Sequence, residues 1–142
     1  MSEERKKRVR TSFLGPHEGR ELELMLEGKK HLSFFFLETG IERSVFPEDE
    51  FDQHVANGFL VKDECIEEFI SRETGKMTSA RNILYATTRE AWRIPAMRMI
   101  QDIYHSLGPG WRPDLERVKG SLLGYDRNEV EQFIERLVRR PG

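Results

Sequence analysis

The chain has 142 residues, of which 37% are hydrophobic and 34% charged, with nine Phe. This is the length of one ordinary domain, and the aromatic content excludes a disordered chain. A single cysteine, Cys65, excludes an internal disulfide. The chain also has no secretory segment and no run of 18 apolar residues, so we expect a soluble, cytoplasmic protein without membrane contact.

Charge is unevenly distributed along the chain, although the net charge is only −2. The amino-terminal basic residues are Arg5, Lys6, Lys7, Arg8 and Arg10. Residues 1–12 have almost no apolar content, so we predict a flexible basic tail followed by a single domain over residues 13–142. Between residues 48 and 73, nine acidic residues face only two basic ones. This middle part of the chain should repel polyanions.

Two patterns in the first third of the chain predict a helix and a strand. The helix runs from about Pro16 to Glu27, with Gly28 placed as its C-terminal cap. Residues 31–37 read His-Leu-Ser-Phe-Phe-Phe-Leu. This run is too short for an independent helix and apolar on both faces, so it predicts a buried central strand.

A second helix is predicted to begin at Pro47. The three acidic residues that follow it suit a first helical turn, where the helix dipole favours negative charge. Phe51 and Val55 would form the buried side, and Asn57-Gly58 would end the helix.

The pattern of residues 59–72 fits either a helix or one face of a strand. We favour a strand because of its neighbours. Residues 73–76, Glu-Thr-Gly-Lys, are typical of a turn, and residues 82–88 make a good partner strand. A hairpin between residues 59 and 88 satisfies both segments.

The stretch from Arg81 to Leu107 combines a strand-like run with an amphipathic helix. Pro95 suits a first helical turn, so we start the helix near Ile94 and end it at residues 108–110, Gly-Pro-Gly. The apolar positions expected to face the core are Met97, Ile100, Ile103, Tyr104 and Leu107. The positions expected on the opposite, polar face are Arg98, Gln101, Asp102 and His105.

The last third of the chain predicts two helices packed as an αα-hairpin. Pro113 begins the first and Gly124 closes it, while Asp126 and Glu129 form a capping-box-like start for the second. The apolar stripe of the second helix is Val130, Phe133, Ile134, Leu137 and Val138. The predicted fold is therefore α+β, with a small mixed or antiparallel sheet of about three strands, about five helices and a C-terminal αα-hairpin.

The order helix, strand, helix, hairpin, helix between Ser33 and Arg93 resembles a winged-helix domain, with residues 81–88 similar to the last wing strand. In a winged helix that reads DNA, the element before the hairpin enters the groove and should be neutral or basic. Here that element carries Glu48, Asp49 and Asp52. The resemblance therefore favours protein contact over DNA contact by this face.

Residues with catalytic or metal-binding chemistry are few. Cys65 lies among acidic neighbours that oppose thiolate formation, so we interpret it as a buried core thiol. The four histidines lie in separate elements without metal-ligand spacing, and no phosphate-binding loop is present. His17 beside Glu18 is either an acid/base pair or a plain first turn, and we favour the turn. We expect no cofactor, no metal and no catalytic residues.

The candidate partner-binding residues are Trp92, Arg93, Trp111, Arg112, Glu48, Asp49 and Asp52. Trp92 and Arg93 occupy the link between strand and helix, where they either project from a rigid scaffold or form a lid on the core. Trp111 lies between Gly-Pro-Gly and Arg112-Pro113. Its ring would either contact a partner protein or fill a space in the core.

These observations predict a non-catalytic regulatory or inhibitory domain of a bacterial or phage type. It would act through contact with another protein, and a partner with a basic surface would match its acidic residues. The alternative is a nucleic-acid-binding regulator with a winged-helix-like core. It would use the basic tail Arg5 to Arg10 together with Arg136, Arg139 and Arg140. A small enzyme whose pocket no motif marks comes third. The sequence does not define an oligomeric state.

Overall fold

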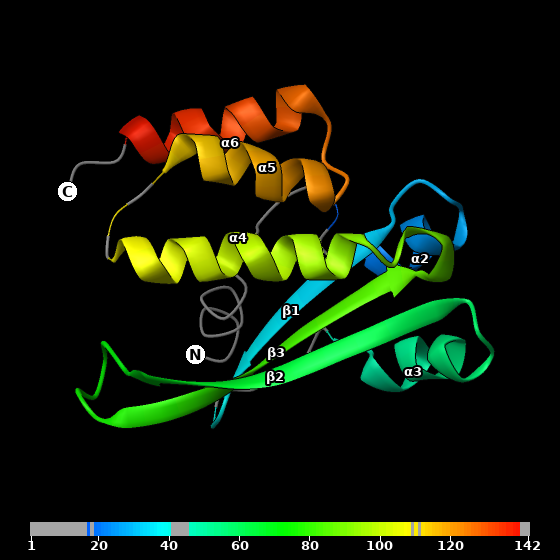
Figure 1. Ribbon diagram of the computed structural model, residues 1–142, viewed down its shortest axis with the longest axis horizontal. Helices are drawn as coiled ribbons and strands as arrows, with labels where there is room; N and C mark the ends of the chain where they lie inside the picture. Colours follow the sequence, from blue (N-terminus) through cyan, green and yellow to red (C-terminus); the bar gives the residue numbers. More distant parts are fainter. Residues whose placement is uncertain (1–16, 18, 41–45, 109, 111, 140–142) are drawn as a thin grey trace.

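The computed structural model describes residues 17, 19–40, 46–108, 110 and 112–139, without the side chains of 137–139 (Figure 1). The predicted tail, with its five basic residues, lies outside the described residues. The described helices and strands are α2 (Glu21–Leu26), β1 (Leu32–Glu38), α3 (Glu48–Ala56), β2 (Leu60–Ile70), β3 (Met77–Thr87), the short 3-10 helix η2 (Thr88–Glu90), α4 (Arg93–Leu107), α5 (Pro113–Leu122) and α6 (Arg127–Arg139). The fold is α+β, as the sequence predicts.

The three strands form one antiparallel sheet in the order β1-β3-β2. The strand prediction for residues 59–72 and the hairpin are confirmed. The prediction that residues 31–37 form the central strand is wrong, because β3 lies between the other two. Strand β1 is apolar on both faces because helices cover both sides of the sheet, so Leu32 and Leu37 are buried in different cores.

Each face of the sheet has its own hydrophobic core. On one face, Leu84 and Ala86 of β3 pack against Ile94 and Met97 of α4 and against Leu122 at the end of α5. On the other face, the alternate β3 residues Ile83 and Tyr85 pack with Met25 of α2 and Phe51 of α3. Figure 1 shows α4, α5 and α6 stacked on one side of the sheet. The molecule therefore has a helical layer on one face and two short helices on the other.

The β2–β3 hairpin continues past the end of α3 (Figure 1). At its tip the Ser71 amide donates to the Lys76 carbonyl over 2.8 Å, and Gly75 adopts a φ of 72°, a conformation that favours glycine. Ile66, Ile70 and Met77 project from the same face of this distal part and are exposed. This group is a small apolar patch on the α3 side of the sheet.

The C-terminal αα-hairpin forms as predicted. The Glu129 amide donates to the Asp126 carboxylate and the Asp126 amide donates to the Glu129 carboxylate, both over 2.8 Å, which is a reciprocal capping box. Gly120 of α5 faces Val130 of α6, where an added Cβ would lie 2.5 Å from a Val130 methyl group. The absence of a side chain on Gly120 therefore allows the two helices to approach closely.

No helix in the described part of the chain has the length and apolar content needed to cross a membrane.

Candidate protein-binding surface

Helix α4 is fixed to the sheet by apolar and polar contacts on its inner side. Met97 is fully buried and Ile94 nearly so, both against Leu84 and Ala86 of the central strand. Beside them, the Arg98 guanidinium donates to the Asn82 side-chain oxygen over 2.5 Å, to the Asn82 carbonyl over 3.2 Å and to Asp63 of β2 over 2.8 Å. The sheet therefore binds an arginine of α4 as well as its apolar residues.

The predicted core side of the helix is confirmed at Met97 and Ile100 and is wrong at other positions. Arg98 and Gln101 were expected on the solvent side, yet Arg98 lies against the sheet and also donates to the Gln101 amide oxygen over 3.0 Å. Leu107 and Ile103 were expected in the core and are exposed. The reason is that β3 carries a polar residue, Asn82, at a buried position, and Arg98 supplies its partner.

The beginning of α4 is tied to the end of α5. Arg93 donates from Nε to the Glu90 carboxylate over 3.0 Å and from Nη1 to the Leu122 carbonyl over 3.1 Å. The same guanidinium lies 4.9 Å from the Trp92 ring centroid, and the Trp92 indole N–H donates to Glu90 over 3.2 Å. Trp92 is thus held by its neighbours while its ring remains exposed.

The end of α4 is tied to the beginning of α5. The Tyr104 hydroxyl donates to the Glu116 carboxylate over 2.5 Å and lies 3.1 Å from the Arg112 carbonyl oxygen. The Lys119 ammonium lies 5.2 Å from the Tyr104 ring centroid. Burial and the Glu116 carboxylate both raise the pKa of the Tyr104 phenol above its usual range, which keeps it protonated as a donor. Both ends of α4 are therefore rigidly placed.

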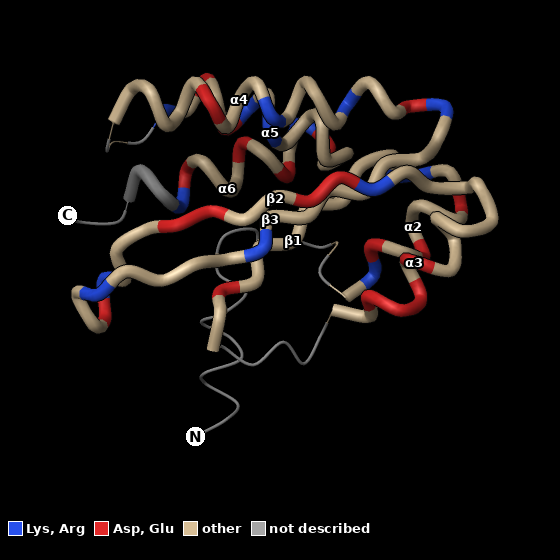
Figure 2. The backbone as a smooth tube through the Cα atoms, turned by 60° about the horizontal axis from the view of Figure 1, so that its bottom comes forward, with Lys and Arg blue, Asp and Glu red and all other residues tan. Residues whose placement is uncertain are grey.

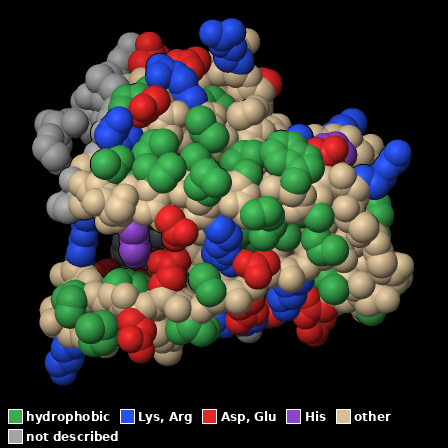
Figure 3. All heavy atoms as spheres, viewed as in Figure 1, with side chains coloured by type: hydrophobic (Ala, Val, Ile, Leu, Met, Phe, Trp, Pro, Cys, Tyr) green, Lys and Arg blue, Asp and Glu red, His purple; other side chains and the backbone are tan. Residues whose placement is uncertain are grey.

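The outer side of α4 is apolar as well, which an ordinary surface helix is not. Trp92 is 56% exposed, Met99 62%, Ile103 36% and Leu107 50%. Pro95 is exposed between Trp92 and Met99. We call these five residues the α4 stripe. They recur at intervals of three or four residues over a helix that is about 22 Å long at 1.5 Å per residue. Figure 3 shows hydrophobic side chains gathered in a band across this face of the helical layer.

The two flanks of the α4 stripe differ in charge. On the side toward β2 lie the carboxylates of Asp102 in α4 and of Asp63 and Glu67 in β2, which we call the acidic flank. Arg98 is their basic neighbour. In the described part of the chain Asp102 has no ion-pair partner. Toward α5, Arg112 pairs with Asp114 over 3.4 Å and Arg117 with Glu131 over 2.8 Å, so the charges balance. Figure 2 shows the acidic positions along β2.

Cys65 lies among the residues of the acidic flank. The interpretation of Cys65 as a buried core thiol is wrong, because the residue is exposed. It lies on β2, which is an edge strand among the described residues, and its side chain is on the same face of the sheet as those of Asp63 and Glu67. Burial of the sulfur, followed by the negative charges of Glu67, Asp63 and Asp102, raises the pKa of the thiol, whereas Arg98 opposes the shift. A raised pKa disfavours a thiolate nucleophile.

Two acidic residues of α3, Glu48 and Asp52, bind this helix to the sheet through ion pairs and hydrogen bonds. Glu48 accepts from Arg81 over 2.5 Å and from Lys62 over 3.1 Å, and Asp52 accepts from Lys62 over 3.0 Å. Asp52 also accepts from the Tyr85 hydroxyl over 2.8 Å. These bonds hold α3 on the sheet, and the Arg81 hydrogen bond is the main reason that the pKa of Glu48 falls to about 2.

A buried lysine links the amino-terminal part of the domain to the C-terminal hairpin. Lys30 is 2% exposed, and its ammonium contacts the Leu123 carbonyl and lies 3.0 Å from His17 Nδ1. The His17 ring stacks on the Tyr125 ring with centroids 4.0 Å apart. Burial lowers the pKa of Lys30 to about 8. Burial and the neighbouring Lys30 charge lower the pKa of His17 to about 4. These contacts tie the amino-terminal part of the domain to the C-terminal hairpin.

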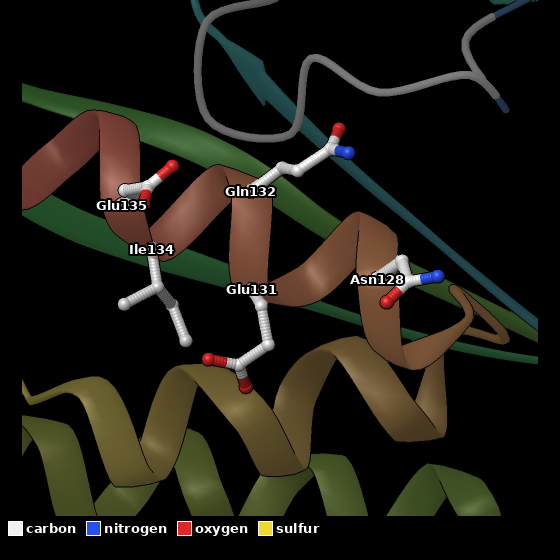
Figure 4. A pocket seen from close by; sticks show the side chains of 5 residues that line it. All are labelled: Asn128, Glu131, Gln132, Ile134 and Glu135. Carbon is white, nitrogen blue, oxygen red and sulfur yellow. The ribbon is translucent and has the colours of Figure 1, made fainter.

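A hollow of about 390 Å³ lies along α6. The described residues that line it all come from this one helix, as Figure 4 shows, and are Asn128, Glu131, Gln132, Ile134 and Glu135. Glu131 is already paired with Arg117. No group of three or more His, Cys, Asp or Glu side chains among the described residues could hold a metal ion. The described residues of the hollow therefore present no converging set of catalytic groups.

The residues singled out from the sequence fall into three groups. Trp92 and Arg93 lie together at the beginning of the α4 stripe, and Arg112 lies at the beginning of α5. Glu48 and Asp52 bind the sheet, while Asp49 beside them is exposed. Trp111 and the five basic residues of the tail lie outside the described residues, and Glu18 does as well.

Met99 was not among the candidates, although it is more exposed than Trp92, Ile103 and Leu107. A signal for it exists in the sequence, since Trp92, Met99, Ile103 and Leu107 share one side of a helix. Periodicity alone does not tell which of two apolar sides faces the core.

No family model, no curated protein and no solved structure matches the chain. The resemblance to a winged-helix domain remains one of element order.

Proposed function

We propose that the protein is a non-catalytic regulatory or inhibitory domain that binds another protein through the α4 stripe. The observation that carries the proposal is that α4 is apolar on both sides, with Met97 fully buried on the sheet and Met99 62% exposed on the outside. A run of exposed apolar side chains on a rigid helix is typical of a protein-binding surface. Trp92, stacked by Arg93, adds an aromatic side chain of the type found at interface hot spots.

The test is affinity capture from native lysate with matched variants. Met99→Asp should abolish retention of the partner, because it places a charge in the middle of the apolar surface. Ile66→Asp is the matched control, since Ile66 is exposed to a similar degree, 60%, but lies in the hairpin patch on the opposite face of the sheet. Circular dichroism checks that both variants fold.

Three results would contradict the proposal. Equal retention by Met99→Asp and the unmodified chain would exclude the α4 stripe. Loss with Ile66→Asp alone would assign binding to the hairpin patch. Loss of retention on nuclease treatment would favour the nucleic-acid-binding alternative.

A further inference from the structure

The two flanks of the α4 stripe are not equivalent, and this difference limits what the surface can bind. On the β2 side lie three carboxylates, those of Asp63, Glu67 and Asp102, but one guanidinium, that of Arg98, which pairs with Asp63. On the α5 side, the charges of Arg112 and Asp114 and of Arg117 and Glu131 cancel in pairs. A partner that covers the apolar stripe therefore meets excess negative charge along one edge only.

We propose that the α4 stripe binds an α-helical segment of a partner protein that carries apolar residues on one side and Lys or Arg along the flank that faces β2. This inference rests on the proposed function and specifies its partner. The stripe is a convex helix of regular spacing, so a second helix can match its intervals of three and four residues with its own. Basic residues on the β2 side would meet the acidic flank.

Asp102 is the residue that points most directly to a basic partner. Arg98 Nε already donates to the Asp63 carboxylate, and the Glu67 carboxylate accepts from the Asn82 side-chain amide. Asp102 is exposed on the outer side of α4, one helical turn after Arg98, and has no ion-pair partner in the described part of the chain. A partner Lys or Arg at this position would gain a charge pair beside an apolar contact, where water is excluded.

A second copy of the chain fits this surface less well. In a two-fold antiparallel pairing of α4 helices, the β2 side of one copy lies beside the β2 side of the other. The two acidic flanks would then meet, and like charges at an interface oppose association. The charge layout thus favours a different, basic partner.

The experiment uses a phage-displayed library of helical peptides as the probe. Each 21-residue peptide carries fixed Leu, Ile and Met at helical spacing, and the two flanks are randomised among Lys, Glu, Gln and Ala. The full chain is the bait, and the Met99→Asp variant removes peptides that bind elsewhere. We expect Lys to be enriched on one flank of the retained peptides and not on the other.

The best selected peptide is then synthesised, and its affinity is measured by fluorescence anisotropy. Asp102→Lys should weaken binding by about tenfold or more, and the effect should shrink at high salt. Asp114→Lys, on the balanced α5 flank, is the matched control and should change the affinity much less.

The possible failures are distinct. Peptides retained through Met99 without a preference for Lys would overturn the inference and leave the proposed function standing. An absence of Met99-dependent peptides would overturn the inference as well, and lysate capture then decides the proposed function independently. A dimer in solution that Met99→Asp dissociates would replace the basic helix with a second copy.

Discussion

The guanidinium of Arg98 donates to both oxygen atoms of Asn82, the side-chain oxygen over 2.5 Å and the carbonyl oxygen over 3.2 Å. Asn82 is 2% exposed in the central strand, and its own amide group donates to Glu67. The buried asparagine thus binds α4 to the sheet beside the apolar contacts of Ile94 and Met97.

The first prediction concerns this contact. Arg98→Met should lower the free energy of unfolding by roughly 2–4 kcal/mol, because the buried Asn82 oxygen loses its donor. Urea denaturation measures the change. Arg117→Met removes an arginine from an exposed pair with Glu131 and should leave the unfolding midpoint nearly unchanged. Equal midpoints for the two variants would show that the Arg98 contact does not hold α4.

The second prediction separates the two sides of α4. Met97→Ala should cost about 2–5 kcal/mol, because Met97 is fully buried and its truncation leaves a cavity. Met99→Ala, two residues further on, should change stability by less than about 0.5 kcal/mol because the side chain is mostly in water. Thermal unfolding of both variants gives the comparison. A large loss for Met99→Ala would place that residue in a core and remove the basis for the α4 stripe as a binding surface.

The third prediction concerns acid stability. The Arg81 hydrogen bond lowers the pKa of Glu48 from 4.5 to about 2. The folded state therefore holds this carboxylate ionised at pH values where the unfolded chain protonates it, so its contribution is complete above pH 4.5 and disappears as the pH falls toward 2. After screening by solvent, the ionised Glu48 contributes about 1–2 kcal/mol to the free energy of unfolding.

Glu48→Gln should flatten the dependence of unfolding free energy on pH between 4.5 and 2. Asp49→Asn, a change of the same kind at the exposed neighbouring position, should retain the slope. Denaturant titrations at a series of pH values distinguish the two. Identical slopes in the unmodified chain and in Glu48→Gln would contradict the assigned pKa.

The fourth prediction concerns His17. Burial and the neighbouring Lys30 charge lower the pKa of this imidazole from 6.5 to about 4, whereas Asp126 raises it. The unfolded chain takes up the proton first, so the folded state should lose about 1–2 kcal/mol as the pH falls from 6.5 to 4. His17→Gln keeps an acceptor for Lys30 but does not titrate, so its stability should be flatter over this interval. A profile unchanged by the substitution would mean that His17 has the same pKa in the folded and unfolded states, and would contradict the lowered value.

Local signals in the sequence were sufficient for much of the fold. Asp126 and Glu129 are three residues apart, and the capping box that they predict is the one that forms. The segment 59–72 was correctly assigned as a strand because a turn and a partner strand follow it. In each case the deciding contacts lie close together along the chain.

The misplaced features depend on contacts between distant residues. The order of the strands follows from the pairing of β1 with β3, about 50 residues apart, which no local pattern specifies. The inner placement of Arg98 on α4 depends on Asn82, and the partners of Lys30 are His17 and Leu123, which are far apart in the sequence. For the candidate surface, Trp92 was found from its place at the link, whereas Met99 required knowledge of which side the sheet covers.

Lys30 also constrains when the fold can be completed during synthesis. Its acceptor at Leu123 is 93 residues away in the sequence, and Tyr125, which stacks on His17, lies just beyond it. A ribosome releases residue 30 long before residue 123, so the Lys30 amine cannot reach this acceptor until Leu123 emerges. The sheet can pair while the chain is still being made. The contacts around Lys30 form only after Leu123 and Tyr125 have left the ribosome.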